Sequence, residues 1–215
     1  MIKAIFFDFD GVLVESVDIK TNAFGRLFES EGEDVVKRVV SYHLDNTGVS
    51  RFEKLRYIYK EILSQQLKEE VFQDLCRRFS KLVVDEVVKA PYVIGAREFL
   101  ENYAQEYRCF IVSATPHEEI EQIIIRRNLK KHFAGIYGAP QKKADIVKKT
   151  IVIDGLMPKQ AVYIGDALSD YKAANTNSVN FIARINNNNE DIFDGISCIK
   201  LENLIELRNI LESNF

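Results

Sequence analysis

Residues 1–12 read MIKAIFFDFDGV, an apolar run that ends in two aspartates and a glycine. The segment Ile2–Phe7 has the length and composition of a buried strand, and Asp8 and Asp10 follow its carboxyl end. Ligands of open α/β sheets bind beyond that end of the strands. Two neighbouring carboxylates repel unless a cation or a shared proton offsets their charge, and Mg²⁺ is a hard cation that such oxygens bind. The alternative interpretation is a solvated turn at the strand end.

The rest of the chain predicts a parallel sheet covered by helices. Further short apolar runs bounded by polar or turn residues predict strands at Cys109–Val112, Ala161–Ile164, Val179–Ala183 and Ser197–Lys200. Helical patterns alternate with them at His117–Arg127, Lys143–Asp154, Leu168–Ala174 and Glu202–Glu212. Strands that alternate with helices indicate an α/β fold with right-handed crossovers.

Residues 15–88 interrupt this alternation with helical patterns alone. Amphipathic segments occur at Val17–Ser30, Ser50–Leu63 and Lys68–Val88, and their apolar spacing is that of core packing. Pro91 and Gly95 mark the return to the sheet, because Pro and Gly punctuate helices. We therefore predict an α/β core of residues 1–14 and 89–215 and a smaller all-helical domain of residues 15–88. Hinges are expected near Val14–Ser16 and Val88–Tyr92, where the chain crosses between the two.

A second acidic cluster follows the predicted strand Ala161–Ile164, in the sequence GDALSD of residues 165–170. Asp166 stands at the strand end, and Asp170 lies four residues later, one turn further if a helix has begun. Taken alone, such a carboxylate can cap a helix and interact with its dipole. Together with Asp8 and Asp10 at the same edge of the sheet, these residues predict a metal site.

Groups that bind anions are predicted at the same edge. Ser113 ends the strand Cys109–Val112 and precedes Ala114 and a helix, and a hydroxyl with free N–H groups at a helix N-terminus binds phosphate. Lys143 begins another helix, and its ammonium can neutralise negative charge, although a lysine there is otherwise an ordinary surface residue. Lys142 is the alternative candidate for this role.

Composition excludes several classes of protein. The 215 residues carry 29 Lys and Arg against 32 Asp and Glu, so the chain lacks the basic excess of a general nucleic-acid binder. Cys76, Cys109 and Cys198 have no spacing that indicates a disulfide framework or a zinc site. The N-terminal segment is not a signal peptide, and no apolar run approaches the roughly 18 residues that span a bilayer. We expect a soluble, cytoplasmic protein that binds neither nucleic acid nor membrane.

The ordered set of motifs resembles the haloacid dehalogenase-like (HAD) hydrolase superfamily. The four motifs of that superfamily match Asp8-Phe9-Asp10-Gly11, Ser113, Lys143 and Gly165-Asp166 with Asp170. The resemblance covers nearly the whole chain and includes a helical cap of the C1 type, as in phosphoglycolate phosphatases and β-phosphoglucomutases. The fold that it implies is a Rossmann-like parallel-sheet core with a four-helix cap.

The resemblance also implies a role for each motif residue. Asp8 would be the nucleophile that attacks phosphorus and forms an aspartyl-phosphate. Asp10 would protonate the leaving alcohol and then activate water. Ser113 and Lys143 would bind the transferring phosphoryl oxygens, helped by the amides of Phe9 and Ala114. Mg²⁺ would be held by Asp8, the backbone carbonyl of Asp10 and Asp166, with Asp170 binding it directly or through water.

Within the superfamily, Asp10 separates the possible chemistries. Metal-independent dehalogenases lack an aspartate at this second position, and phosphonatases have a small residue there, so the resemblance favours phosphate esters. We expect a Mg²⁺-dependent phosphatase that acts on a small phosphorylated metabolite. Two alternatives remain: a phosphosugar mutase similar to β-phosphoglucomutase, and a non-catalytic protein that binds a phosphorylated ligand.

Basic residues of the predicted cap are the candidates for substrate recognition. Arg51 lies in the sequence GVSR, which is similar to a stretch of β-phosphoglucomutase whose arginine binds the distal phosphate. Ser50 is also an expected helix N-cap, a role compatible with that one. Lys20 stands where the mutases carry a histidine, which weakens the mutase hypothesis. Lys20, Arg51 and Lys54 favour a substrate with a second anionic group or many hydroxyls, such as a sugar phosphate; no oligomeric state is predicted.

Overall fold

The protein is described by a computed structural model for residues 1–186 and 189–215. Its described part holds a parallel six-stranded sheet with the strand order β3-β2-β1-β4-β5-β6. The strands are β1 (Ala4–Phe7), β2 (Arg108–Pro116), β3 (Gly135–Ala139), β4 (Ala161–Gly165), β5 (Asn180–Arg184) and β6 (Ile199–Leu201). The helices are α1 (Val17–Leu27), α2 (Glu33–Asp45), α3 (Arg51–Tyr57), α4 (Glu69–Lys89), α5 (Ala96–Asn102), α6 (His117–Arg126), α7 (Lys143–Ile153), α8 (Leu168–Thr176) and α9 (Leu207–Ser213). The predicted Rossmann-like α/β fold is confirmed.

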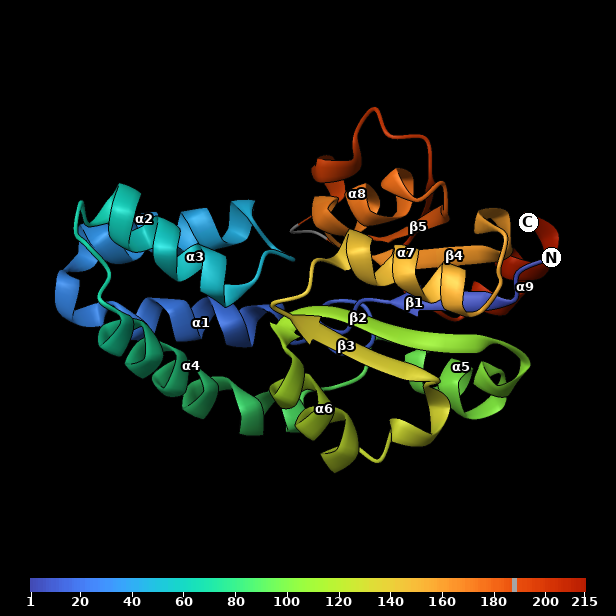
Figure 1. Cartoon of the computed structure of the whole chain (residues 1–215), viewed down its shortest axis with the longest axis horizontal. Helices are drawn as coiled ribbons and strands as arrows, with labels where there is room; N and C mark the ends of the chain where they lie inside the picture. Colours follow the sequence, from blue (N-terminus) through green and yellow to red (C-terminus); the bar gives the residue numbers. More distant parts are fainter. Residues whose placement is uncertain (187–188) are drawn as a thin grey trace.

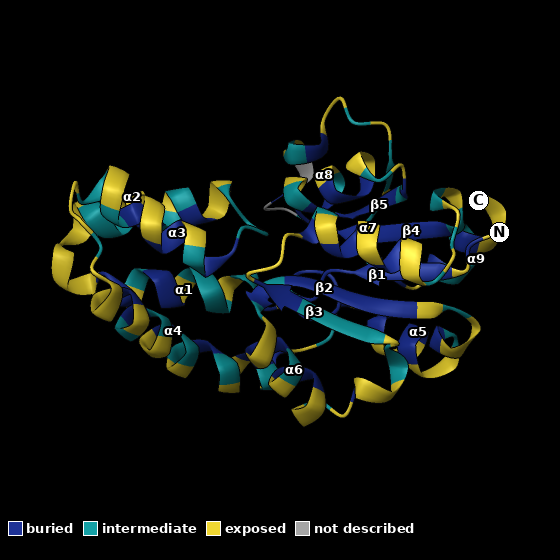
Figure 2. Ribbon diagram, in the orientation of Figure 1, coloured by how far each residue is buried: buried dark blue, intermediate teal, exposed yellow. Residues whose placement is uncertain are grey.

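Strand β1 shows why the sheet needs helices on both of its faces. Its four side chains are all buried, and they alternate between two hydrophobic clusters. Ile5 and Phe7 belong to the cluster that α5, α6 and α9 share, whereas Ala4 and Phe6 pack with residues of α7 and α8. Figure 2 shows β1, β2 and β4 in dark blue, as buried strands between these helices, whereas the edge strand β3 is partly exposed. The sequence motifs at the strand ends are thereby held at one edge of a rigid layer.

Helices α1 to α4 lie together on one side of the sheet, beyond the carboxyl end of β1 (Figure 1). They span residues 17–89, and the sequence predicts a helical domain over residues 15–88. One hydrophobic cluster continues from the sheet into these helices, through residues such as Phe24, Phe79 and Val83. We call helices α1 to α4 and their connections the cap; its division from the core into a separate domain remains a prediction.

The two segments that join the cap to the core lie side by side. Val14 and Tyr92 form an isolated antiparallel bridge, and the Glu15 amide donates to the Pro91 carbonyl over 2.9 Å. The guanidinium of Arg127, at the end of α6, donates to the carbonyls of Val87, Val88 and Ala90. The C-terminal end of α4 is therefore anchored by a residue of the core. These segments are the predicted hinges, and their hinge role stays a prediction.

The observed elements differ from the sequence-based expectations at β2, β3, α2 and α5. The strand predicted over Cys109–Val112 extends as far as Pro116, with an irregular register after Val112. Ser113 therefore lies within β2, and α6 begins at His117, where the predicted helix also begins, so Ala114, Thr115 and Pro116 separate Ser113 from the helix. Strand β3 and helices α2 and α5 have no counterpart among the predicted elements. No helix of the described residues has the length and apolar character to cross a membrane.

Candidate active site

The loop after β1 is built so that Asp8 and Asp10 face the edge of the sheet. The Asp8 amide continues the strand by donating to the Ile164 carbonyl over 3.0 Å, and the chain then turns back. Gly11 has φ of 76°, and a Cβ atom there would lie 2.1 Å from an oxygen of Asp166. Glycine is required at this position by its left-handed backbone and by the close approach of the β4 loop.

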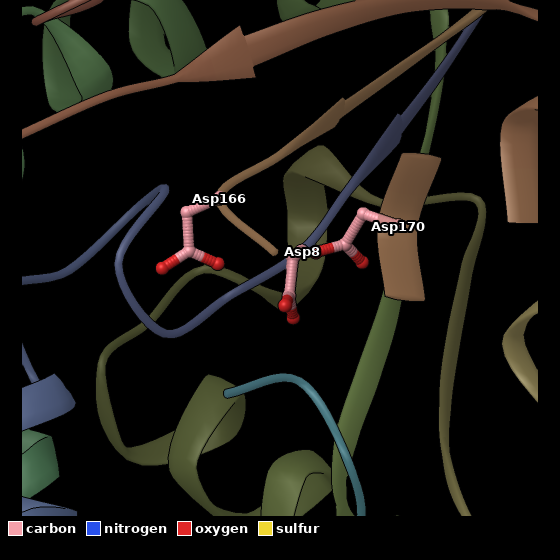
Figure 3. Close-up of side chains that lie close together, drawn as sticks. All are labelled: Asp8, Asp166 and Asp170. Atoms are coloured by element: carbon pink, nitrogen blue, oxygen red, sulfur yellow. The ribbon is translucent and has the colours of Figure 1, made fainter. Parts of the chain in front are cut away.

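Three buried carboxylates meet at this edge. Oxygen atoms of Asp8, Asp166 and Asp170 all lie within 4.8 Å of one another (Figure 3). Their carboxylates come from the ends of β1 and β4 and from the first turn of α8. The Asp10 carboxylate is not in this cluster, and the expected role of its backbone carbonyl as a metal ligand stays a prediction. Such a set of hard oxygen donors fits a small divalent cation.

Lys143 lies between two of these carboxylates. Its ammonium donates to Asp8 over 2.8 Å and to Asp170 over 2.7 Å, and all three side chains are buried. Lys142 is exposed and forms no contact with the cluster among the described residues. Of the two candidate lysines, the geometry therefore brings Lys143 to the carboxylates.

The cluster carries more negative charge than one lysine offsets. Burial, together with repulsion from Asp170 and Asp10, raises the pKa of Asp8 to about 7, although Lys143 acts in the opposite direction. Burial and the same kind of repulsion raise the pKa of Asp166 well above its usual value. A bound divalent cation would relieve this repulsion and keep the carboxylates ionised. The residues present therefore fit the metal that the motifs imply.

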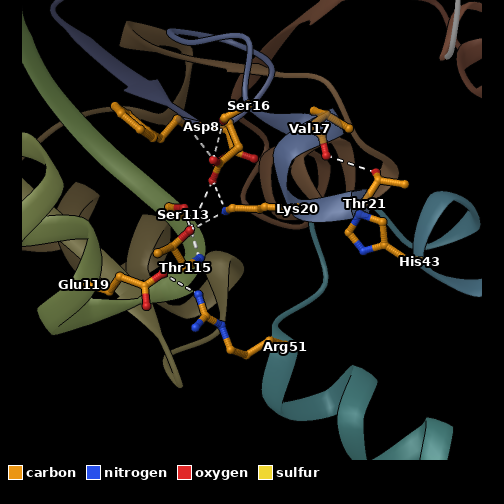
Figure 4. A network of polar contacts seen from close by, with 12 residues as sticks. Asp8, Ser16, Val17, Lys20, Thr21, His43, Arg51, Ser113, Thr115 and Glu119 are labelled. Atoms are coloured by element: carbon orange, nitrogen blue, oxygen red, sulfur yellow. Dashed lines mark hydrogen bonds and ion pairs between the residues drawn. The ribbon is translucent and has the colours of Figure 1, made fainter. Parts of the chain in front are cut away.

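The Asp10 carboxylate has a different environment, because the polar groups that contact it are hydrogen-bond donors. Its carboxylate accepts hydrogen bonds from Ser16 over 2.6 Å and Thr115 over 3.1 Å, and it forms an ion pair with Lys20. Figure 4 shows Lys20 of α1, Ser16 just before α1 and Thr115 of β2 near one another. Burial alone would raise the pKa of Asp10, but the ammonium of Lys20 and the three hydrogen bonds outweigh it and lower the pKa. Asp10 is thus held as a carboxylate, the form that accepts a proton.

The predicted phosphate-binding residues Ser113 and Ala114 line a cavity together with Lys143. Ser113 is buried, and its hydroxyl accepts a hydrogen bond from the Thr115 amide over 3.1 Å. Ala114 lines the same cavity as Asp8 and Asp10. The Phe9 amide, expected to help bind phosphate, donates to the Asp8 carboxylate over 2.6 Å.

A cavity of about 60 Å³ separates these core residues from the cap. The cap side of its lining includes the three basic residues predicted from the sequence, Lys20, Arg51 and Lys54, together with His43. Arg51 donates to Ser80 over 2.8 Å and forms a buried ion pair with Glu119 of α6, so its charge is matched within the protein. Ser50 caps α3, as predicted, by accepting a hydrogen bond from the Glu53 amide.

The cap is closed over the core in this structure. Gly48, in the loop before α3, accepts a hydrogen bond from the Ser169 hydroxyl over 3.1 Å. A Cβ atom on Gly48 would lie 2.3 Å from that hydroxyl oxygen and 2.8 Å from the Ala167 side chain. The cap loop therefore touches the same loop that carries Asp166.

Comparison with known proteins places this site in a family. A family model described as haloacid dehalogenase-like hydrolase matches residues 5–184, from β1 to the end of β5. The chain belongs to the haloacid dehalogenase-like hydrolase family. The resemblance inferred from the four motifs is thereby confirmed, and the matched region spans the cap as well as the core.

Curated relatives of this HAD hydrolase carry phosphatase names. A phosphorylated carbohydrates phosphatase of Thermotoga maritima is 26% identical over 185 residues, which are 80% of each chain. A phosphoglycolate phosphatase of Pseudomonas savastanoi pv. phaseolicola is 24% identical over 84% of this chain and 68% of its own length. Among solved structures, a β-phosphoglucomutase from Clostridium difficile has a TM-score of 0.77 at 18% identity, covering 99% of this chain and 96% of that chain. That likeness shows a shared fold.

Several residues that contact the site of this HAD hydrolase lie outside the four sequence motifs and were not predicted from them. Thr115 and Ser16 bind Asp10, Glu119 binds Arg51, and His43 binds Lys54. A further residue, Arg184 at the end of β5, donates to the Gly11 carbonyl over 3.2 Å and so holds the loop after β1. Apart from Thr115, which is two residues from the motif residue Ser113, no spacing rule could have identified them.

Proposed function

We propose that this HAD hydrolase is a Mg²⁺-dependent phosphatase that cleaves a small phosphorylated metabolite through an aspartyl-phosphate on Asp8. The observation that carries the proposal is the contrast between two aspartates at one cavity. Asp8 lies against Lys143 in the carboxylate cluster, whereas Asp10 is surrounded by proton donors. One residue is therefore suited to attack phosphorus, and the other to exchange protons.

In the first step, a carboxylate oxygen of Asp8 forms a bond to phosphorus as the bond to the ester oxygen breaks. Lys143 donates to Asp8, and Ser113 lines a cavity together with Lys143; both side chains would stabilise the negative charge on the phosphoryl oxygens. The leaving alcohol requires a proton, and the hydrogen-bonded pair of Asp10 and Lys20 is the group that would supply it. In the second step, water attacks phosphorus as the bond between phosphorus and the Asp8 oxygen breaks, which releases inorganic phosphate and restores the Asp8 carboxylate. The pair of Asp10 and Lys20 takes up the proton of the attacking water.

The metal has a defined place in this scheme. Asp8, the backbone carbonyl of Asp10, and Asp166 would hold it. Both oxygens of Asp170 already accept hydrogen bonds, from Lys143 and from the Ala167 amide, which supports a contact from Asp170 through water. When bound, Mg²⁺ would supply positive charge beside the phosphoryl group and the buried carboxylates.

The proposed substrate class is a small phosphorylated carbohydrate or a related acid. The printed names of the two curated relatives support this class, as does the small cavity under the closed cap. The cap would open for exchange of substrate and product, and would close to keep stray water from the intermediate.

The test is phosphate release from a panel of esters, with and without Mg²⁺, by the wild type and by Asp8→Asn. The panel holds hexose and pentose phosphates, phosphoglycolate, nucleotides and phosphorylated sugar acids. We expect Mg²⁺-dependent release that falls by about 10³-fold or more in Asp8→Asn, because the nucleophile is lost. Isomerisation of β-glucose 1-phosphate without phosphate release would favour the mutase instead. No reaction in either assay would contradict an enzymatic role and favour a protein that only binds phosphorylated ligands.

A further inference from the structure

The cap presents three cations to the cavity, and two of them are neutralised within the protein. Lys20 forms an ion pair with Asp10 and also donates to Thr115 over 2.7 Å. Arg51 forms a buried ion pair with Glu119. Each of these cations has a carboxylate partner that is present before any substrate binds. Neither of them requires a further anion to balance its charge.

Lys54 has no such partner. Its side chain is 2% exposed, and no carboxylate of the described residues lies within ion-pair distance of it. The ammonium donates to His43 instead, over 2.8 Å to Nδ1 and 3.3 Å to the backbone carbonyl. An ammonium has three N–H donors, so one remains for the cavity that Lys54 lines.

His43 does not supply the missing negative charge. Burial, together with the charges of Lys54 and Lys20, lowers the pKa of His43 to about 2, so its ring is neutral at physiological pH. Because Nδ1 accepts from Lys54, the ring proton lies on Nε2, which has no hydrogen-bond partner among the described residues. His43 also packs against the Phe24 ring at 4.7 Å between centroids. It thus positions the Lys54 ammonium without neutralising it.

A purely structural role would not require an amine at this position. Lys54 is enclosed by the cap, and an apolar side chain of similar length would fill the same space without burying a charge. Burial, with repulsion from Lys20 and Lys143, lowers the pKa of Lys54 to about 7, although the Asp166 carboxylate, which is not hydrogen-bonded to it, acts weakly in the opposite direction. An anion placed beside it would stabilise the charged form. An unbalanced buried cation at a binding cavity therefore indicates a ligand that brings the counter-charge.

We propose that Lys54 binds a second anionic group of the substrate, so that the hydrolase prefers phosphate monoesters that also carry a carboxylate or a second phosphate. This inference rests on the proposed phosphatase function and narrows its substrate class. The scissile phosphate lies against Asp8 at the core end, and the second anion lies against Lys54 at the cap end. Because both residues line one small cavity, the two groups are separated by only a few bonds.

The experiment compares matched substrates that differ in the second charge. The first pair is 3-phosphoglycerate and glycerol 3-phosphate, and the second is fructose 1,6-bisphosphate and fructose 6-phosphate. The two pairs distinguish a carboxylate from a phosphate as the second group. Each ester is assayed with the wild type, Lys54→Met, Lys54→Gln and Lys60→Met. Lys60 is the matched control, because it lies on the cap surface with a side chain that is 82% exposed.

We expect the wild type and Lys60→Met to favour the doubly anionic member of at least one pair by about 10- to 100-fold in kcat/KM, as for a charge-assisted hydrogen bond. Both Lys54 variants should lose this preference while they still hydrolyse the singly charged member, which shows that they fold. If the wild type had equal kcat/KM for the two members of each substrate pair, the inference about Lys54 would be overturned and the proposed phosphatase function would stand. The same holds for a preference that persists without Lys54, or for an equal loss on both members of a pair. If the wild type hydrolyses no ester, the proposed function itself fails, and the inference with it.

Discussion

Burial of the Lys54 ammonium lowers the free energy of unfolding, and this effect can be measured without any substrate. Its pKa falls from 10.5 in the unfolded chain to about 7 in the folded one. Between pH 7 and 10.5 the unfolded chain binds the extra proton, so the free energy of unfolding rises with pH across this window. At pH 7 and below, the full penalty applies. The residue that recognises the substrate is therefore expected to destabilise the fold.

We predict that Lys54→Met raises the free energy of unfolding at pH 7 by up to about 5 kcal/mol, from about 1.4 kcal/mol for each unit of the pKa shift from 10.5 to about 7. The gain should shrink as the pH approaches 10.5. Urea unfolding at pH 7 and pH 10 measures both values, and Lys60→Met, at an exposed position, should change neither. A variant less stable than the wild type at pH 7 would show that Lys54 supports the fold.

The ion pair of Lys20 and Asp10 predicts a shift in the pH profile. Removing the ammonium in Lys20→Met leaves Asp10 buried with two hydroxyl donors, so the pKa of Asp10 should rise. Asp10 accepts a proton only when ionised, and the acidic limb of the kcat/KM profile should therefore move to higher pH. We also expect kcat to fall by about 10²-fold, as for loss of general acid–base assistance. A profile that keeps its acidic limb in place would mean that Lys20 does not control Asp10.

At the scale of single residues, the candidate site was largely predictable where motif residues follow strands. Asp8, Asp166 and Lys143 came together because the ends of parallel strands share one edge of the sheet. Glu119 could not be predicted, because it meets Arg51 across 68 residues of sequence and only in the closed cap. The effect of that pair is that Arg51, the expected ligand of a distal phosphate, already has a partner.

At the scale of elements, the sequence did not predict strand β3 or the full length of strand β2. Strand β3 reads GIYGA, and its two glycines break the apolar run that would indicate a strand. It lies at the edge of the sheet, where only one neighbour stabilises it. Strand β2 is longer than its apolar run, because pairing with β3 carries it through Ser113 to Pro116. In both cases tertiary pairing decides the structure, and local pattern does not.

The loop before α3 offers a test of cap closure. Gly48→Ala should clash with Ser169 and Ala167, and φ of 75° would be strained as well. Gly32→Ala is the matched control, because Gly32 has φ of 93° in the cap with no atom within 4 Å of its would-be Cβ. We expect Gly48→Ala to lower kcat/KM by about tenfold or more through weaker closure, since about 1.4 kcal/mol is tenfold, with Gly32→Ala close to the wild type in activity. Equal kinetics in the two variants would show that this contact does not contribute.

At the scale of the whole molecule, Glu119 of the core joins two cap helices. It accepts a hydrogen bond from Ser80 of α4 over 2.6 Å and pairs with Arg51 of α3. Removing one member of a buried ion pair leaves the other charge uncompensated. This arrangement ties cap closure to the integrity of a single buried carboxylate.

We predict that Arg51→Met lowers the free energy of unfolding by about 3 kcal/mol, the usual cost of breaking a buried pair. The double variant Arg51→Met with Glu119→Met should recover most of that loss, because no lone charge remains. Urea unfolding of both single variants and the double variant measures their coupling energy. Strictly additive effects would mean that the two side chains act independently.

The loop between β4 and α8 serves two contacts at once. Asp166 belongs to the carboxylate cluster, and Ser169 donates its hydroxyl proton to Gly48 of the cap. If a bound cation fixes this loop, it also favours the closed cap. Thermodynamic reciprocity then requires that the factor by which the cation tightens substrate binding equals the factor by which substrate tightens cation binding. A saturated enzyme should therefore resist chelators that strip the free one, and its metal requirement should fall as substrate concentration rises.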